Sequence, residues 1–214
     1  MKSLIVVAHM DDEALSCGGL IARSEEAHVV VVYGRKYVGE SASQNEESLI
    51  AERDDFYQSL LTLGCTRCTL LMLEEGEPHR VGYYAVLEKI EEVLRQTDFD
   101  EVVLPSELDM NQDHRMLADV MKIVCRPANL GTVKRVLKSL AHDSKMVTPQ
   151  YFVPMTQEEM DRKIDAIGCY RREARSKAHP RSPENIVAMA RIHGSKCGHE
   201  YAEGYEVHLI REST

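Results

Sequence analysis

The chain has 214 residues, of which 43% are hydrophobic, and its formal net charge is −9. This length and apolar content are enough for one α/β domain with a full core, so we expect a single domain over residues 1–214. The negative charge and the absence of a block of Lys and Arg in the sequence argue against a protein that grips a nucleic-acid polymer or an anionic membrane.

The apolar run near the N-terminus, LIVVA, is shorter than the core of a signal peptide and far shorter than the roughly 18 apolar residues of a membrane span. We therefore expect a soluble cytoplasmic protein. Its six scattered cysteines are then expected to be reduced and mostly packed. One CxxC pair, Cys65 and Cys68, has no second pair with which to bind zinc, so packing is favoured over a metal site.

Short runs rich in Val and Ile alternate along the chain with stretches of helical periodicity. The predicted strands are 3–8, 28–33, 69–73 and 101–105, with 133–140, 151–153 and 205–210 as further candidates. The predicted helices are 13–26, 45–63, 83–96, 157–172 and 183–193, and the basic stretch 174–182 is interpreted only as a connection. This alternation predicts an α/β fold, a Rossmann-like three-layer sandwich with a mostly parallel sheet.

Acidic residues and histidines follow two of the predicted strands, as HMDDE at 9–13 and ELDMNQDHR at 107–115. Because ligands bind outside the carboxyl ends of parallel strands, both groups are expected at one edge of the sheet. They offer imidazoles and carboxylates of the kind that hold a catalytic zinc or iron ion and leave room for water. A bound cation would also offset the repulsion between Asp11 and Asp12.

The acids of the first group have a second interpretation, since carboxylates at the start of a helix cap backbone N–H groups and complement the helix dipole. For that group alone the two interpretations are equally supported. The second group of histidine and acids, at a matching strand end, favours a site.

The stretch AHMDDEALSCGG (8–19) resembles the AHPDDE signature of the LmbE-like, or PIG-L, deacetylases, in which an amide on a sugar or a related small molecule is hydrolysed at a zinc site. NQDHR (111–115) falls where that family has HPDH. ARIHGSKCGHEYAEGY (190–205) is similar to the C-terminal segment of the branch that deacetylates N-acetylglucosaminyl malate. With fainter likeness in LLTLGC and KIDAIGCY, the resemblance runs nearly end to end.

The resemblance implies a function for each matching residue. It makes His9, Asp12 and His114 the metal ligands, for zinc or ferrous iron, and Asp11 the general base. Asp113 would lie behind the ligands and orient a neighbouring histidine or loop. The implied reaction is removal of an N-acyl group, most simply N-acetyl, from a glucosamine-containing small molecule by metal-activated water.

Two residues depart from the family motifs. Met10 replaces a proline and removes no functional group. Asn111 replaces the first histidine of HPDH, a residue expected to stabilise the oxyanion and to help protonate the leaving group. An asparagine amide can donate a hydrogen bond to an oxyanion, but it cannot donate a proton. His79 or His142, on predicted loops, could supply the missing imidazole.

Three consequences of Asn111 stay open. In the favoured one, Asn111 is the oxyanion donor and Asp11 carries out both proton transfers. In the second, the substrate is a different amide that brings its own acid. In the third, the protein binds a metal but is catalytically impaired and acts as a binding or accessory protein. A nucleotide-binding or methyl-transferring Rossmann protein would need a glycine-rich loop in place of HMDDE.

Four other side chains are candidates for substrate binding. Arg35 and Arg53 could hold a phosphate or a carboxylate, although each also suits a solvated surface. Tyr201 and Glu203 lie in the segment that matches the family branch, and the alternative is that Tyr201 packs while Glu203 pairs with a cation such as Arg191. The expected partner is a small-molecule N-acyl amino sugar. The exact sugar, the metal and the oligomeric state stay open, a homo-oligomer included.

Overall fold

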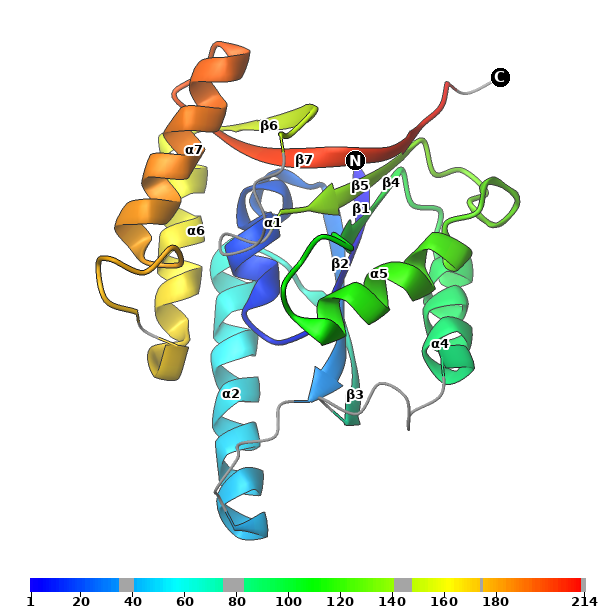
Figure 1. Ribbon diagram of the computed structural model, residues 1–214, viewed down its shortest axis with the longest axis horizontal. Helices are drawn as coiled ribbons and strands as arrows, with labels where there is room; N and C mark the ends of the chain where they lie inside the picture. Colours follow the sequence, from blue (N-terminus) through cyan, green and yellow to red (C-terminus); the bar gives the residue numbers. More distant parts are fainter. Residues whose placement is uncertain (35–40, 75–82, 141–147, 174, 213–214) are drawn as a thin grey trace.

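The computed structural model describes residues 1–34, 41–74, 83–140, 148–173 and 175–212. Within these ranges, seven strands form one sheet with the order β3-β2-β1-β4-β5-β7-β6 (Figure 1). The strands are β1 (Lys2–Val7), β2 (Glu26–Gly34), β3 (Arg67–Glu74), β4 (Glu101–Pro105), β5 (Arg135–Ser139), β6 (Tyr151–Met155) and β7 (Tyr201–Ile210). The α-helices are α1 (Asp12–Arg23), α2 (Ala42–Leu63), α4 (Tyr83–Gln96), α5 (Gln112–Val124), α6 (Gln157–Cys169) and α7 (Pro183–Cys197).

The sheet is mostly parallel, as predicted. Strands β1 to β5 pair in parallel, whereas β7 is antiparallel to both β5 and β6. The chain moves outward from β1 through β2 to β3 and then returns, so that β4 lies on the other side of β1. Open α/β sheets bind their ligands outside the carboxyl ends of the strands at such a reversal. The topology therefore predicts a ligand site at the carboxyl ends of β1 and β4.

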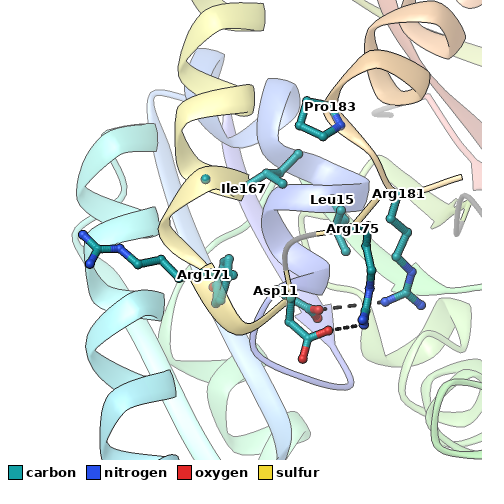
Figure 2. A pocket seen from close by; sticks show the side chains of 10 residues that line it. Asp11, Leu15, Ile167, Arg171, Arg175, Arg181 and Pro183 are labelled. Atoms are coloured by element: carbon teal, nitrogen blue, oxygen red, sulfur yellow. Dashed lines mark hydrogen bonds and ion pairs between the residues drawn. The ribbon is translucent and has the colours of Figure 1, made fainter. Parts of the chain in front are cut away.

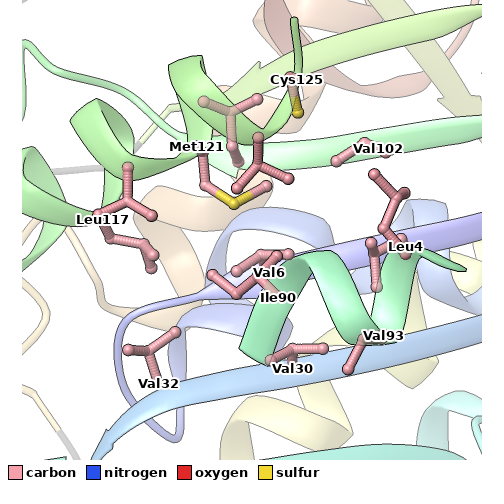
Figure 3. Close-up of a cluster of buried hydrophobic side chains, with 14 of the residues drawn as sticks. Leu4, Val6, Val30, Val32, Ile90, Val93, Val102, Leu117, Met121 and Cys125 are labelled. Carbon is pink, nitrogen blue, oxygen red and sulfur yellow. The ribbon is translucent and has the colours of Figure 1, made fainter. Parts of the chain in front are cut away.

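Alternate residues of the central strands face two separate cores. Leu4, Val6 and Val102 pack under α4 and α5, whereas Ile5 and Val103 face the core formed with α1, α2 and α6. Figure 3 shows the first of these cores, and Figure 1 shows the helices on the two sides of the sheet. Burial on both faces explains why these strands are continuous apolar runs. The predicted three-layer sandwich is confirmed.

The sequence interpretation misses one helix and starts one strand too late. The helix α5 was not among the predicted helices, and because it begins at Gln112, Asp113 and His114 lie in its first turn. The apolar spacing that buries this helix starts only at Leu117, after the polar first turn. Strand β7 begins at Tyr201, four residues before the predicted strand.

No helix in the described ranges is long and apolar enough to cross a membrane. The single-domain organisation, the cytoplasmic location and the oligomeric state stay predictions.

Candidate metal centre

Three side chains converge at the carboxyl ends of β1 and β4. His9 and Asp12 follow β1, and His114 lies in the first turn of α5. His9 Nδ1 lies 3.2 Å from His114 Nε2 and 3.4 Å from Asp12 Oδ2. His114 Nε2 lies 3.1 Å from the same Asp12 oxygen. All three residues are buried, so this triad is shielded from bulk water.

The triad meets the distances that a metal ion would impose. Two donors bound to a tetrahedral zinc at roughly 2.0–2.1 Å lie about 3.3 Å apart, close to the three separations measured here. Two imidazoles and one carboxylate also leave a coordination position open, as catalytic sites require. His9, Asp12 and His114 could therefore hold a divalent cation.

A carboxylate stands behind each histidine of the triad. Asp113 Oδ2 lies 3.2 Å from His9 Nε2, and Asp109 Oδ2 lies 2.8 Å from His114 Nδ1. In each ring, the nitrogen that faces Asp113 or Asp109 donates a hydrogen bond to that residue. The other ring nitrogen faces Asp12. This is the arrangement that fixes the tautomer of metal-binding histidines. Asp109 was missed by the sequence analysis, although it lies in the same segment as Asn111.

The carboxylates also change the acidity of both histidines. Burial lowers the pKa of His9, but the hydrogen bonds to Asp113 and Asp12 outweigh burial and raise it to about 9. Burial likewise opposes the charge of His114, yet Asp12 and Asp109 raise its pKa to about 10. Without a metal, the surrounding carboxylates therefore favour protonated imidazole in this site, and a binding cation must displace protons.

Asp11 occupies the turn between β1 and α1 with an unusual backbone. Its φ is 117°, in the region that favours glycine, and such a conformation costs about 1–3 kcal/mol. The backbone N–H of Asp11 donates to Glu13 Oε2 at 3.0 Å. Glu13 is itself fixed, because Oε1 accepts from Ser59 Oγ at 2.7 Å and from Tyr170 Oη at 2.5 Å. Strained non-glycine residues cluster at functional sites, and Asp11 is a candidate of this kind.

The Asp11 side chain lines a pocket of about 310 Å³ between α1, α6 and the segment that leads to α7. Figure 2 shows its carboxylate turned toward the guanidinium group of Arg181. The distance from Asp11 Oδ2 to Arg181 Nη1 is 3.9 Å. Asp11 and Asp12 are neighbours in the chain, yet Asp11 lines this pocket and Asp12 belongs to the triad.

Asn111 is the N-cap of α5. Its side-chain Oδ1 accepts from the backbone N–H of Asp113 at 2.8 Å, and its own N–H donates to Asp109 Oδ1 at 2.8 Å. The cap uses the amide oxygen, whereas an oxyanion donor would use the amide nitrogen. Capping and oxyanion stabilisation are thus compatible at this residue.

Among the described contacts of Arg53, Tyr201 and Glu203, none is with the triad. Arg53 is exposed on α2, and Arg35 lies outside the described residues, as do His79 and His142. Tyr201 is buried, and its hydroxyl contacts Arg191 and donates to Gln157 at 3.1 Å.

Glu203 lies against the middle of α1. Its two oxygens accept from the N–H groups of Gly19 and Leu20, each at 2.8 Å. Its cationic partner is Lys163 rather than Arg191, and Lys163 also donates to the Leu15 carbonyl at 2.8 Å. In the described contacts, Glu203 therefore ties β7 to α1.

A protein-family model described as PIG-L, GlcNAc-PI de-N-acetylase, matches residues 4–125, more than half of the chain. The chain belongs to the PIG-L family. The matched range includes all three members of the triad in this PIG-L protein, as well as Asp11, Asp109 and Asp113. No curated protein matches the chain.

Several solved structures share the fold of this PIG-L chain. N,N'-diacetylchitobiose deacetylase from Pyrococcus horikoshii is 20% identical with a TM-score of 0.75, over 96% of this chain and 83% of that one. The zinc-inhibited form of teicoplanin deacetylase is 15% identical with a TM-score of 0.76, over 100% of both chains. GalB, a 4-carboxy-2-hydroxymuconate hydratase from Pseudomonas putida KT2440, is 20% identical with a TM-score of 0.80, over 100% and 99% of the two chains.

Proposed function

We propose that this chain is a metal-dependent deacetylase that removes the acetyl group from an N-acetylated amino sugar. The observation that carries the proposal is the buried triad, in which each histidine is held by its own carboxylate. Membership of a family described by de-N-acetylation supports the reaction class. The ligand set suits zinc, with ferrous iron as the alternative.

Zinc bound by the triad would polarise the amide carbonyl and lower the pKa of an attacking water. Asp11, adjacent to the ligand Asp12, accepts the proton of that water and then delivers it to the leaving nitrogen. The C–N bond breaks, and acetate and a free amine leave. Asn111 donates its amide N–H to the developing oxyanion. Asp109 and Asp113 keep the imidazoles oriented throughout.

The test combines metal content with amine release from a panel of N-acetylglucosamine conjugates, with and without a chelator. We expect about one metal per chain and amine release that the chelator abolishes. Asp11→Asn should abolish turnover and leave the metal content unchanged, whereas His114→Ala should lose the metal.

Asp119→Asn is the matched control, because Asp119 is exposed on α5 and pairs with Lys122. It should behave like the unmodified protein. A metal-loaded protein that releases no amine from any conjugate would contradict the proposal and favour a binding or accessory function, or a different amide.

Hydration of a carbon–carbon double bond is a second candidate, because a metal and a carboxylate base can also direct water to that bond. It is favoured by the likeness to the hydratase GalB and by the arginines of the pocket, which suit a carboxylate-rich substrate. Loss of ultraviolet absorbance from 4-carboxy-2-hydroxymuconate, without amine release from the sugar panel, would support this candidate over the first.

A further inference from the structure

We propose that the buried ion pair between Lys163 and Glu203 positions Asp12 of the triad, by fixing the helix that carries it. Lys163 lies on α6 and Glu203 on β7, and both elements pack against α1 (Figure 1). The inference rests on the metal site of the proposed function and adds to it two positioning residues outside the triad.

The first argument is the free-energy cost of burying the pair. The side chains of Lys163 and Glu203 are only 3% and 6% exposed. The cost of taking two charges out of water can exceed their mutual attraction, so a buried ion pair is weak evidence for added stability. Such pairs are best attested where they fix one arrangement of the elements that they join. The pair therefore calls for a positional explanation.

The second argument is the set of backbone groups that the pair contacts on α1. Glu203 accepts from the N–H groups of Gly19 and Leu20, and Lys163 donates to the Leu15 carbonyl, all at 2.8 Å. The carbonyl of residue 15 and the N–H of residue 19 are the two partners of one helical i→i−4 pair. An acid thus faces backbone donors and a base faces a backbone acceptor within one turn. Contacts of both kinds restrict the rotation of α1 and its position along its axis.

The third argument is the short distance from the pair to the triad. Ser16 lies one turn after Asp12, and both line a small cavity of about 10 Å³ together with His114. The Ser16 carbonyl lies 3.4 Å from the Tyr205 hydroxyl, which donates to Glu203 at 2.8 Å. Because an α-helix rises 1.5 Å per residue, the contacted turn begins about 4.5 Å from Asp12 along the axis. A shift of α1 at this turn would move Asp12 relative to His114, which belongs to α5.

The fourth argument is the fit of the pair against the helix backbone. A Cβ atom on Gly18 would lie 2.9 Å from Lys163 Cγ. One on Gly19 would clash with Met155 Sδ and lie 3.1 Å from Glu203 Cδ. Glycine weakens the interior of a helix, but here it lets both charged side chains lie directly against α1.

The experiment measures zinc affinity by competition with a fluorescent chelator, and the stability of the metal-free protein by urea unfolding. Glu203→Gln leaves Lys163 buried without this counterion. It should lower the urea midpoint and weaken zinc binding about tenfold or more.

The double variant, Lys163→Met with Glu203→Gln, separates positioning from stability. It removes both charges, so it should regain most of the urea midpoint. It also turns an amide NH₂ toward a backbone N–H and removes the lysine donor of the Leu15 carbonyl, so zinc binding should stay about tenfold or more weaker. If zinc affinity returned together with the midpoint, the pair would only stabilise the fold, and the proposal would be overturned.

Glu101→Gln is the matched control for a lost buried carboxylate. Glu101 accepts from Ser3 Oγ at 2.6 Å and from Arg135 Nη2 at 2.8 Å, and it begins β4, at the end of the strand opposite the triad. This variant should lower the urea midpoint and leave zinc affinity unchanged. Equal losses of zinc affinity in Glu101→Gln and Glu203→Gln would trace the loss to stability alone and overturn the proposal.

Gly18→Ala tests the same contact with both charges kept. Its added Cβ presses on the Lys163 side chain, so zinc binding should weaken about tenfold. In Gly168→Ala, on α6, the added Cβ meets no described atom within 4 Å, and zinc affinity should not change. Equal zinc affinity in these two alanine variants would count against the proposal even if the charge variants failed to fold.

Amine release separates this inference from the proposed function. Weak zinc binding in the double variant, with no amine released by the metal-loaded unmodified protein, would support the positioning and refute the deacetylase proposal. Unchanged zinc affinity in the double variant, with chelator-sensitive amine release by the unmodified protein, would refute the positioning and leave the deacetylase proposal standing. An unmodified protein that binds no zinc would refute both.

Discussion

The Glu13 carboxylate accepts a hydrogen bond from the backbone N–H of Asp11 at 3.0 Å, across a turn in which the φ of Asp11 is 117°. In this turn the side chains of two successive acids lie in different sites, since Asp12 belongs to the triad and Asp11 lines the pocket. Glu13, the third acid of the DDE sequence, thus fixes the backbone of the turn at Asp11. Its own position is fixed from α2 by Ser59 and from the end of α6 by Tyr170.

Glu13→Ala should therefore lower kcat about tenfold or more while the metal content stays near that of the unmodified protein. It should also reduce the free energy of unfolding by about 1–3 kcal/mol, because three buried donors lose their acceptor. Glu13→Gln keeps an amide oxygen for the Asp11 N–H and should restore most of both. Steady-state kinetics, elemental analysis and urea unfolding measure these effects. Unchanged kcat in the alanine variant would refute the positioning of Asp11 by Glu13.

Asp109→Asn should weaken metal affinity about 10- to 100-fold, because it removes the carboxylate that orients His114. Competition with a fluorescent chelator measures this affinity. Asp119→Asn, on the exposed face of the same helix, should have no effect. If the two variants bind metal equally well, Asp109 does not orient the ligand.

The metal-free protein should lose stability as the pH rises above neutrality. The folded pKa values of His9 and His114, about 9 and about 10, lie above the ordinary value of 6.5. Their contribution to the free energy of unfolding is therefore complete below about pH 6.5, and it is lost as the pH rises through the two pKa values of the folded protein. Urea unfolding of chelator-treated protein between pH 6 and 10 measures it. A flat profile would mean that the neighbouring carboxylates do not stabilise protonated imidazole at this site.

Asn111→Asp separates capping from catalysis. Aspartate is as good an N-cap as asparagine, so stability should change by less than about 0.5 kcal/mol. It lacks the amide N–H, however, so kcat should fall by about 10²–10³, the effect of removing an oxyanion donor. Asn111→His should keep or raise the rate of an ordinary deacetylase. Full activity in the aspartate variant would leave Asn111 with only a structural function.

Much of the fold could be predicted because each buried parallel strand is a continuous run of apolar residues in the sequence. Val29 and Val30 point to opposite cores, and both cores are apolar. The position of the triad could be predicted for a related reason, since strand ends in a parallel sheet lie at one edge. The helix α5 was not predicted, although its buried apolar residues have helical spacing, because its first turn is polar and carries the site residues Asp113 and His114.

The pocket and the contacts of Glu203 could not be predicted, because they depend on segments far apart in the chain. Arg181 approaches Asp11 only after α6 and β6 have placed the segment before α7. One alternative for Glu203 was pairing with a cation, but which cation lies beside it depends on the packing of α6 against α1. Spacing within a sequence carries no information about such contacts.

The bond between Glu203 and the Gly19 N–H joins residues 184 positions apart, and it involves a strand that pairs on both sides. During synthesis the N-terminal helix with Asp12 emerges long before β7 is made, since chains grow at roughly 5–20 residues per second. Until then Lys163 lacks Glu203 as its counterion, and β5 has β4 on one side but no strand on the other. The ligand-bearing helix is thus supported by a strand that is translated long after it, and a nascent chain is not expected to bind metal with full affinity before β7 is complete.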